Sequence, residues 1–226
     1  RAAEQENANA QLNLGIMYAN GEGVPEDDAT AVMWYTRAAE QGNVYAQFNL
    51  GLMYVSGEGI PKDDATAIIW LTRAAEQGNA YAQFNLGITY ANGEGVPEDD
   101  ATAVMWFTKA AEQGYANAQF NLGVMCANGE GVAEDDAMAV TWYTRAAEQG
   151  NAPAQAYLGL MYANGEGIPE DDVMAYMWIN LAAAQREERA MGAKDRLAIT
   201  MTAADVSEAQ VFSRECLAQS YKNCGY

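Results

Sequence analysis

The sequence predicts an all-α solenoid made of antiparallel helix pairs, and three observations support this prediction. A motif of 36 residues occurs five times in succession in the chain of 226 residues, with no change in length. A repeat of this length is typical of solenoids, in which each unit buries its apolar side against its neighbours. Within each repeat, apolar residues recur three or four positions apart in two segments, which a Gly-x-Gly turn separates. The two positions that mark the period carry Gly15, Gly51, Gly87, Gly123 and Gly159, and Trp34, Trp70, Trp106, Trp142 and Trp178.

The first half of the second repeat is expected to form a helix that ends near Ser56. Ala46, Leu50 and Tyr54 are four residues apart and therefore share one helix face. Gly51 lies beside them, although glycine in a helix interior costs about 1 kcal/mol relative to alanine. Because this glycine recurs in every repeat, it predicts the close approach of a neighbouring helix. A Gly-Glu-Gly segment then ends the helix after Ser56.

The second half of the repeat is expected to form a helix that begins after Asp63. An aspartate at this position can accept hydrogen bonds from the free backbone N–H groups of the first turn. Ala67, Trp70 and Ala74 follow at helical spacing, and Gly78 stands where glycine commonly ends a helix. Each repeat is therefore expected to hold two antiparallel helices and no third.

The beginning of the chain looks like the end of a repeat. Residues 1–5 have the same sequence as residues 37–41, which close the first repeat. We therefore expect that part of a preceding repeat comes before residue 1 in the native protein. With this remnant included, the five repeats are expected to occupy residues 1–185.

The end of the chain departs from the repeat. After residue 185 the repeat pattern lapses, and we expect one helix at about 188–199. Thr202 can cap a last helix, which is expected at about 203–220. Because the terminal unit of a solenoid needs a polar outer face, we interpret residues 186–226 as a helical capping segment.

The composition excludes several classes of function. The chain has 31 acidic and 12 basic residues, and its formal net charge is −19. This charge repels phosphate backbones, so we expect no nucleic-acid partner, and it favours basic protein surfaces. No apolar run reaches the roughly 18 residues that a membrane span requires. The chain has no histidine, the commonest general base and a frequent zinc ligand, so we expect neither an enzyme nor a cofactor or metal site.

Two recurrent charge patterns are interpreted as structural. The acidic segment at residues 25–28 recurs with little change, but it lacks the alternating ligands and central glycine of a calcium-binding loop. Helix capping explains it without a metal. Arg73 precedes Glu76 by three residues, and other repeats keep this spacing. The spacing predicts exposed ion pairs, each worth a few tenths of a kcal/mol.

One string of residues recurs through the five repeats, with substitutions at some positions, and carries a family resemblance. It reads Ala-x-x-x-Leu-Gly-x-x-Tyr-x-x-Gly-x-Gly-Val-x-x-Asp, followed by Ala, Trp-Tyr and Ala-Ala-Glu-Gln-Gly. In the first repeat these residues are Ala10, Leu14, Gly15, Tyr18, Gly21, Gly23, Val24, Asp27, Ala31, Trp34, Tyr35 and residues 38–42. The string resembles the Sel-one-like repeat (SLR) family, a relative of the tetratricopeptide repeats, from residue 1 to about 185. The resemblance implies a right-handed superhelix that acts as an adaptor or scaffold, often in bacterial envelopes.

The resemblance also implies a binding surface on the first helix of each repeat. In the tetratricopeptide relatives, the corresponding face lines a concave groove that binds peptides. Here it carries aromatic rings beside asparagines, whose carboxamides can hydrogen-bond a peptide backbone. The predicted binding residues are Tyr45, Phe48, Asn49, Leu52, Tyr81, Phe84, Asn85, Ile88, Asn117, Phe120, Asn121 and Val124. In an alternative interpretation, the same side chains pack the first helices against one another.

The three cysteines differ in their expected roles. Cys216 and Cys224 would be about 12 Å apart on a continuous helix, which is too far for a disulfide. If the helix ends near Ser220 and the tail folds back, the two can pair, and similar pairs close the tail of exported SLR proteins. A disulfide favours a periplasmic or secreted location. Cys126 replaces the repeat tyrosine, and we expect a buried, inert thiol there.

The expected function is that of a non-catalytic scaffold that binds a protein or peptide, and the net charge favours a basic one. The resemblance leaves three alternatives open. The chain could be an immunity-type inhibitor of a secreted toxic enzyme such as a phospholipase. It could be a structural protein of the envelope, or it could be a hydrolase, as suggested for some cysteine-rich relatives. The sequence leaves the oligomeric state open.

Overall fold

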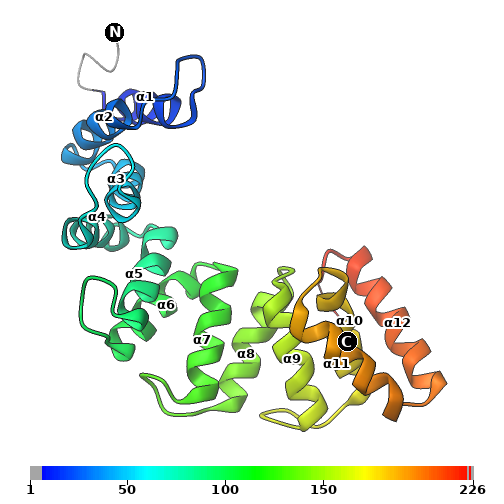
Figure 1. The fold of residues 1–226 in the computed structure, drawn as a ribbon. Coiled ribbons are helices and arrows are strands. Elements are labelled where there is room, and N and C mark those ends of the chain that lie inside the picture. The colour runs from blue at the N-terminus through cyan, green and yellow to red at the C-terminus, as the bar shows by residue number, and fades with distance from the viewer. Residues whose placement is uncertain (1–6, 223, 225–226) are drawn as a thin grey trace. The chain divides into compact units, whose positions relative to one another are not determined.

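The computed structural model describes residues 7–222 and 224, and these residues form an all-α solenoid, as predicted (Figure 1). The supposed remnant of a preceding repeat, residues 1–5, lies outside the described residues. The described part of the chain contains twelve helices and no strand. In chain order they are α1 (Ala8–Asn20), α2 (Asp28–Glu40), α3 (Val44–Ser56), α4 (Asp64–Glu76), α5 (Ala80–Asn92), α6 (Asp100–Glu112), α7 (Ala116–Asn128), α8 (Asp136–Ala147), α9 (Ala152–Asn164), α10 (Asp172–Ala184), α11 (Glu188–Thr200) and α12 (Ala203–Ala218).

The chain forms two compact units, residues 1–110 and 111–226, and the division falls in the last turn of α6. Consecutive helices pack against one another from α1 to α5 in the first unit. In the second unit the same is true from α7 to α11. None of the helices in the described part of the chain is both long and apolar enough to span a membrane.

The first helices α1, α3, α5 and α9 begin at an asparagine side-chain cap, and each ends at a glycine. In α3 the side chain of Asn43 accepts a hydrogen bond from the backbone N–H of Ala46, at 3.0 Å. After Ser56, Gly57 adopts the left-handed conformation (φ 79°), and its N–H donates to the carbonyl of Met53. Glycine adopts this conformation without steric cost. The helix therefore ends where the sequence predicted.

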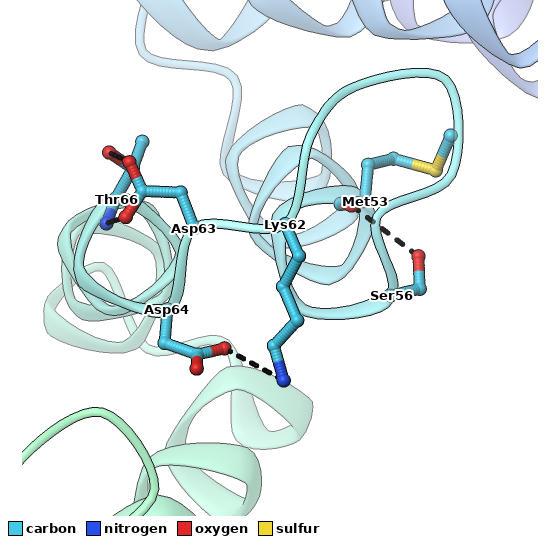
Figure 2. A network of polar contacts seen from close by, with 6 residues as sticks. All are labelled: Met53, Ser56, Lys62, Asp63, Asp64 and Thr66. Carbon is cyan, nitrogen blue, oxygen red and sulfur yellow. Dashed lines mark hydrogen bonds and ion pairs between the residues drawn. The ribbon is translucent and has the colours of Figure 1, made fainter.

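The second helix of the same pair begins at the predicted aspartate cap. Asp63 accepts hydrogen bonds from the backbone N–H and the hydroxyl of Thr66, at 3.1 and 2.6 Å (Figure 2). The bond from the Thr66 hydroxyl, followed by that from its N–H, holds the pKa of the Asp63 carboxyl below its usual value. Next to this cap, the ammonium of Lys62 lies 3.3 Å from a carboxylate oxygen of Asp64 (Figure 2).

The helix glycine allows the two helices of a pair to approach closely. A β-carbon added to Gly51 would lie 2.8 Å from Cγ of Leu71, on the second helix of the same pair. At Gly87 it would lie 2.5 Å from two ring carbons of Phe107. Neither distance is possible for a real side chain, so only glycine fits, and the predicted close approach is confirmed. The same register pairs Gly15 with Tyr35, Gly123 with Tyr143 and Gly159 with Ile179.

Buried glutamines join consecutive pairs, and this contact was not predicted. In α3, Gln47 donates from its side-chain amide to the carbonyl of Ala39, at the end of α2. Its side-chain oxygen accepts from Gln77, at the end of α4, at 2.7 Å. Gln155 makes the same two bonds in the second unit, to the carbonyl of Ala147 at 3.1 Å and from Gln185 at 2.9 Å. Gln47 and Gln155 therefore each link the ends of two successive second helices.

The last two helices follow the fifth repeat and contact its second helix, α10. The helices α11 and α12 correspond to the two predicted after residue 185, and Thr202 caps α12. Both α11 and α12 pack against α10. The hydroxyl of Ser213 on α12 donates to the carbonyl of Met177 at 3.3 Å. Met177 and Leu181 are buried, whereas the equivalent residues of the first repeat, Met33 and Arg37, are exposed.

The tail after α12 is joined back to the helix. Cys216 and Cys224, the predicted pair, form a disulfide with their Cα atoms 4.9 Å apart. The helix ends before Ser220, where the backbone takes a positive φ of 53° and reverses direction. This turn is what brings the two cysteines together.

Candidate binding surface on the first helices

The predicted binding face is most exposed at two tyrosines. Tyr45 on α3 and Tyr81 on α5 occupy the same register of consecutive repeats, and 62% and 54% of their surface is exposed. Phe48 is half-buried, and its ring centroid lies 6.0 Å from that of Tyr81. In the first unit, therefore, a partly buried phenylalanine supports one of two exposed tyrosines on adjacent first helices.

The other two predicted phenylalanines each contact the second helix of their own pair, and Phe120 also contacts the next first helix. The half-buried ring of Phe84 lies 5.9 Å from that of Phe107, on the second helix of the same pair. In the second unit, Phe120 lies 5.9 Å from Tyr143 and 5.4 Å from Tyr157. The Phe120–Tyr157 contact joins two first helices, as the alternative interpretation has it, whereas the Phe84–Phe107 contact lies within one pair. Each phenylalanine keeps part of its surface accessible.

The predicted asparagines have different surroundings. Asn49 is hydrogen-bonded to the hydroxyl of Tyr35, from the preceding repeat. Asn85 donates to the backbone carbonyl of Tyr81 at 2.8 Å. Asn117 accepts from the side-chain amide of Asn151 at 2.9 Å. These three therefore have partners within the fold. The remaining predicted residues, Leu52, Ile88, Asn121 and Val124, are half-buried.

A pocket of about 170 Å³ lies between α3, α4 and α5. Two of these helices, α3 and α5, carry the exposed tyrosines. We call this cavity the Leu71 pocket. It is lined by Val55, Lys62, Asp64, Ala67, Ile68, Leu71, Asn85, Ile88, Thr89 and Glu94. Of these residues, only Asn85 and Ile88 were predicted to bind a partner.

The register of Leu71 is common to two of the pockets. The register of Leu71 carries a ring in three repeats, at Tyr35, Phe107 and Tyr143. In the fifth repeat it carries Ile179, and a second pocket of about 300 Å³ lies there, between α9, α10 and α11. Both aliphatic residues therefore line a pocket. The loss of the ring was visible in the sequence, but its consequence depends on the neighbouring helices.

The second unit has an aromatic cluster that the sequence analysis missed. Tyr157 stands where the earlier repeats have an asparagine, and its ring lies 5.4 Å from that of Tyr143. The guanidinium of Arg189, on α11, lies 4.6 Å from the centre of the Tyr157 ring. Among the described residues, the Tyr143 hydroxyl is buried without a hydrogen-bond partner. Burial, followed by the neighbouring Tyr157, raises the pKa of Tyr143.

Comparison with known families and structures agrees with these repeats. The Sel1 repeat family model matches residues 8–43, 44–79, 80–115, 116–151 and 152–186. The chain belongs to the Sel1 repeat family. Sel1 repeats typically mediate protein interactions, and the family is generally non-catalytic. No curated protein matches the chain in sequence.

Several solved Sel1 repeat structures are similar to the chain. A protective antigen of uropathogenic Escherichia coli strains, which displays an SLR fold, is 36% identical, with a TM-score of 0.88 over 97% of the chain. The chain spans about half of that protein, 48% of its length. A Sel1 repeat protein of Oxalobacter formigenes is 35% identical, with a TM-score of 0.82, over 93% of this chain and 88% of its own. An immunity protein of Pseudomonas aeruginosa shares the fold at 19% identity and a TM-score of 0.51, over 94% of this chain and 82% of its own.

On the second helices of this chain, cationic side chains stack on tryptophan rings. The predicted interaction was an ion pair between Arg73 and Glu76. The structure instead places the Arg73 guanidinium 4.5 Å from the ring centre of Trp70, three residues before it. A cation over an indole ring gains about 0.5–1 kcal/mol at an exposed site, more than an exposed helical ion pair. The same stacking joins Arg37 to Trp34, Lys109 to Trp106 and Arg145 to Trp142.

Proposed function

We propose that this Sel1 repeat protein is a non-catalytic scaffold that binds a peptide or protein segment along its first helices. The observation that carries the proposal is the exposure of Tyr45 and Tyr81, which follow one another at the same register. Exposed tyrosines give a partner a large contact area at little cost in side-chain entropy, and their hydroxyls can also hydrogen-bond. Phe48, which supports the ring of Tyr81, adds apolar surface to the same face.

We further propose that the partner is basic and that binding takes place in an oxidising compartment. The formal net charge of −19 attracts cationic surfaces and accelerates their association. The Cys216–Cys224 disulfide is typical of periplasmic and secreted proteins. Both features support the location and partner class without identifying one partner.

A catalytic role has little support in the chemistry of the side chains. The chain has no histidine to act as a general base. An acidic residue that acts as a general acid needs a raised pKa. Asp27, Asp63 and Asp99 have lowered pKa values instead, because a threonine side chain hydrogen-bonds each carboxylate.

An immunity-type inhibitor is the second candidate and would use the same kind of surface. The likeness to the Pseudomonas aeruginosa immunity protein supports the fold alone. We therefore propose that the chain binds a partner, and we do not propose that it inhibits one. Rescue of growth when the chain is co-expressed with a toxic secreted phospholipase would favour the inhibitor over the adaptor.

The proposal can be tested with peptides selected from a displayed random library on the immobilised chain. We expect enriched peptides to bind the Tyr45→Ser/Tyr81→Ser variant at least tenfold more weakly than the native chain, as measured by calorimetry. Because both side chains are largely exposed, the melting temperature should change little. Substitution of Phe84 is less suitable, because its ring also packs on Phe107.

The matched control is Ile69→Ser, which removes an exposed apolar side chain from a second helix. Ile69 is 52% exposed, close to the value for Tyr81. This variant should retain the peptide affinity. Equal affinities for the native chain and the tyrosine variant would refute the first-helix surface. A loss of binding that is as large in the Ile69 variant would indicate nonspecific apolar contact.

A further inference from the structure

We propose that the Leu71 pocket anchors one phenylalanine or leucine side chain of a basic segment in the partner. This inference rests on the proposed function and adds a specific anchor to it. The pocket lies on the same face as the exposed tyrosines, because Tyr81, Asn85 and Ile88 follow one another by four and three residues on α5. A segment lying over Tyr81 can therefore reach the pocket within about one helical turn.

The pocket occupies space that an aromatic ring fills in other repeats. In the first repeat, the ring of Tyr35 is 4% exposed, and its hydroxyl is hydrogen-bonded to Asn49 on the next first helix. Leu71 and Asn85 are the equivalent residues one repeat later. Leu71 is too short to reach Asn85 as a tyrosine would, and both side chains line the pocket. The pocket is therefore about as large as the ring that is missing.

The size and lining of the pocket suit one apolar side chain. An apolar cavity of about 150 Å³ holds a benzene-sized group, and the Leu71 pocket measures about 170 Å³. Val55, Ala67, Ile68, Leu71 and Ile88 supply apolar walls. A phenylalanine or leucine side chain is of this size, whereas alanine would leave most of the pocket empty.

The charges of the pocket favour basic residues next to the anchor. Two carboxylates, Asp64 and Glu94, line it together with one ammonium, that of Lys62. Lys62 is already paired with Asp64 at 3.3 Å (Figure 2). The local balance is therefore negative, in agreement with the net charge of the chain. The pocket at Ile179 differs in this respect, because Arg196 is the one charged residue in its lining.

The test uses three tripeptide probes, Ac-Lys-Phe-Lys-NH2, Ac-Lys-Leu-Lys-NH2 and Ac-Lys-Ala-Lys-NH2, with the full chain labelled on its methyl groups. We expect the Phe and Leu probes to shift the methyl resonances of Ile68, Leu71 and Ile88, and the Ala probe to leave them unchanged. The methyl groups of Ile179 should respond at least tenfold more weakly, because Arg196 repels the lysines. An equal response at Ile179 would refute the preference for a basic segment.

The decisive variant is Leu71→Tyr, which introduces the side chain found in the first and fourth repeats. We expect it to weaken binding of the Phe probe at least tenfold while the melting temperature stays the same or rises, because the new ring fills the pocket. The control is Ile69→Tyr, which adds a ring on the exposed side of the same helix and should bind as the native chain does. If Leu71→Tyr lowers the melting temperature, Leu71→Phe, the residue type of the third repeat, replaces it.

The outcomes separate this inference from the proposed function. Unchanged binding of the Phe probe by the filled variant would refute the anchor, and peptides that still depend on Tyr45 and Tyr81 would leave the proposed function intact. Absence of any shift with the Phe and Leu probes would also refute the anchor. If the filled variant loses the probe while the selected peptides bind Tyr45→Ser/Tyr81→Ser as tightly as the native chain, the anchor stands and the tyrosine surface is wrong.

Discussion

Replacing Gln155 by alanine is expected to destabilise the second unit by about 3–4 kcal/mol. Gln155 is fully buried and makes two side-chain hydrogen bonds, to the carbonyl of Ala147 and from Gln185. Each bond contributes about 1 kcal/mol net. The space left by the shortened side chain costs about 1–2 kcal/mol more. Helix propensity adds little, because alanine and glutamine differ by only a few tenths of a kcal/mol.

The two contributions can be separated with Gln155→Met. Methionine keeps most of the buried volume but makes neither hydrogen bond, so this variant should lose about 2 kcal/mol. The carbonyl of Ala147 then keeps its bond from the N–H of Gly150, at 2.9 Å, and is not left unpaired. Urea denaturation followed by circular dichroism measures both values. The exposed Gln210→Ala, on α12, is the control and should change stability by less than about 0.5 kcal/mol.

A methionine variant as stable as the native chain would show that the two hydrogen bonds of Gln155 do not contribute to stability. In that case the glutamine would contribute volume only, and the bonds that link successive pairs would be incidental. A loss of less than about 1 kcal/mol in the alanine variant would refute the buried position as well, because both estimated terms depend on it.

Two further predictions concern the tail and the helix caps. Reduction of the Cys216–Cys224 disulfide, or its replacement by serines, should lower the free energy of unfolding by about 2.5 kcal/mol, since the closed loop spans eight residues. Thermal melts with and without reductant check this, and an unchanged midpoint would contradict it. Asp27, Asp63 and Asp99 have pKa values below the ordinary 3.8, so their stabilisation is complete above that pH and is lost as the pH falls through the lowered values. The triple Asp→Asn variant keeps the caps without titrating, and melts below pH 4 should show a shallower loss of stability than in the native chain.

The helices and their ends could be predicted from the sequence because their causes are local. Asp63 caps α4 through Thr66, three residues away, and Gly57 ends α3 through Met53, four residues away. The interior glycines could also be predicted, because a residue that disfavours helix recurs at one position. Such signals lie within a few residues and need no knowledge of the neighbouring repeat.

The burial of individual side chains on one helix face could not be predicted in the same way. Tyr45 and Phe48 share a helix face, yet one is exposed and the other half-buried, because adjacent helices cover them unequally. The burial of Gln155 depends on the ends of two second helices, α8 and α10. The change from tyrosine to Leu71 keeps the position apolar, so the pattern conceals a pocket that three helices define.

The sequence of α11 affects where further 36-residue repeats could be added to the array. In α11, Lys194 and Asp195 occupy the register that Leu50 and Gly51 occupy in α3. A helix with these residues offers no gap for a partner helix of its own, and α12 packs on α10 instead. A 36-residue block duplicated among the internal repeats would keep the close helix approach that Gly51 and its equivalents allow, whereas a block placed directly after α11 would lack it.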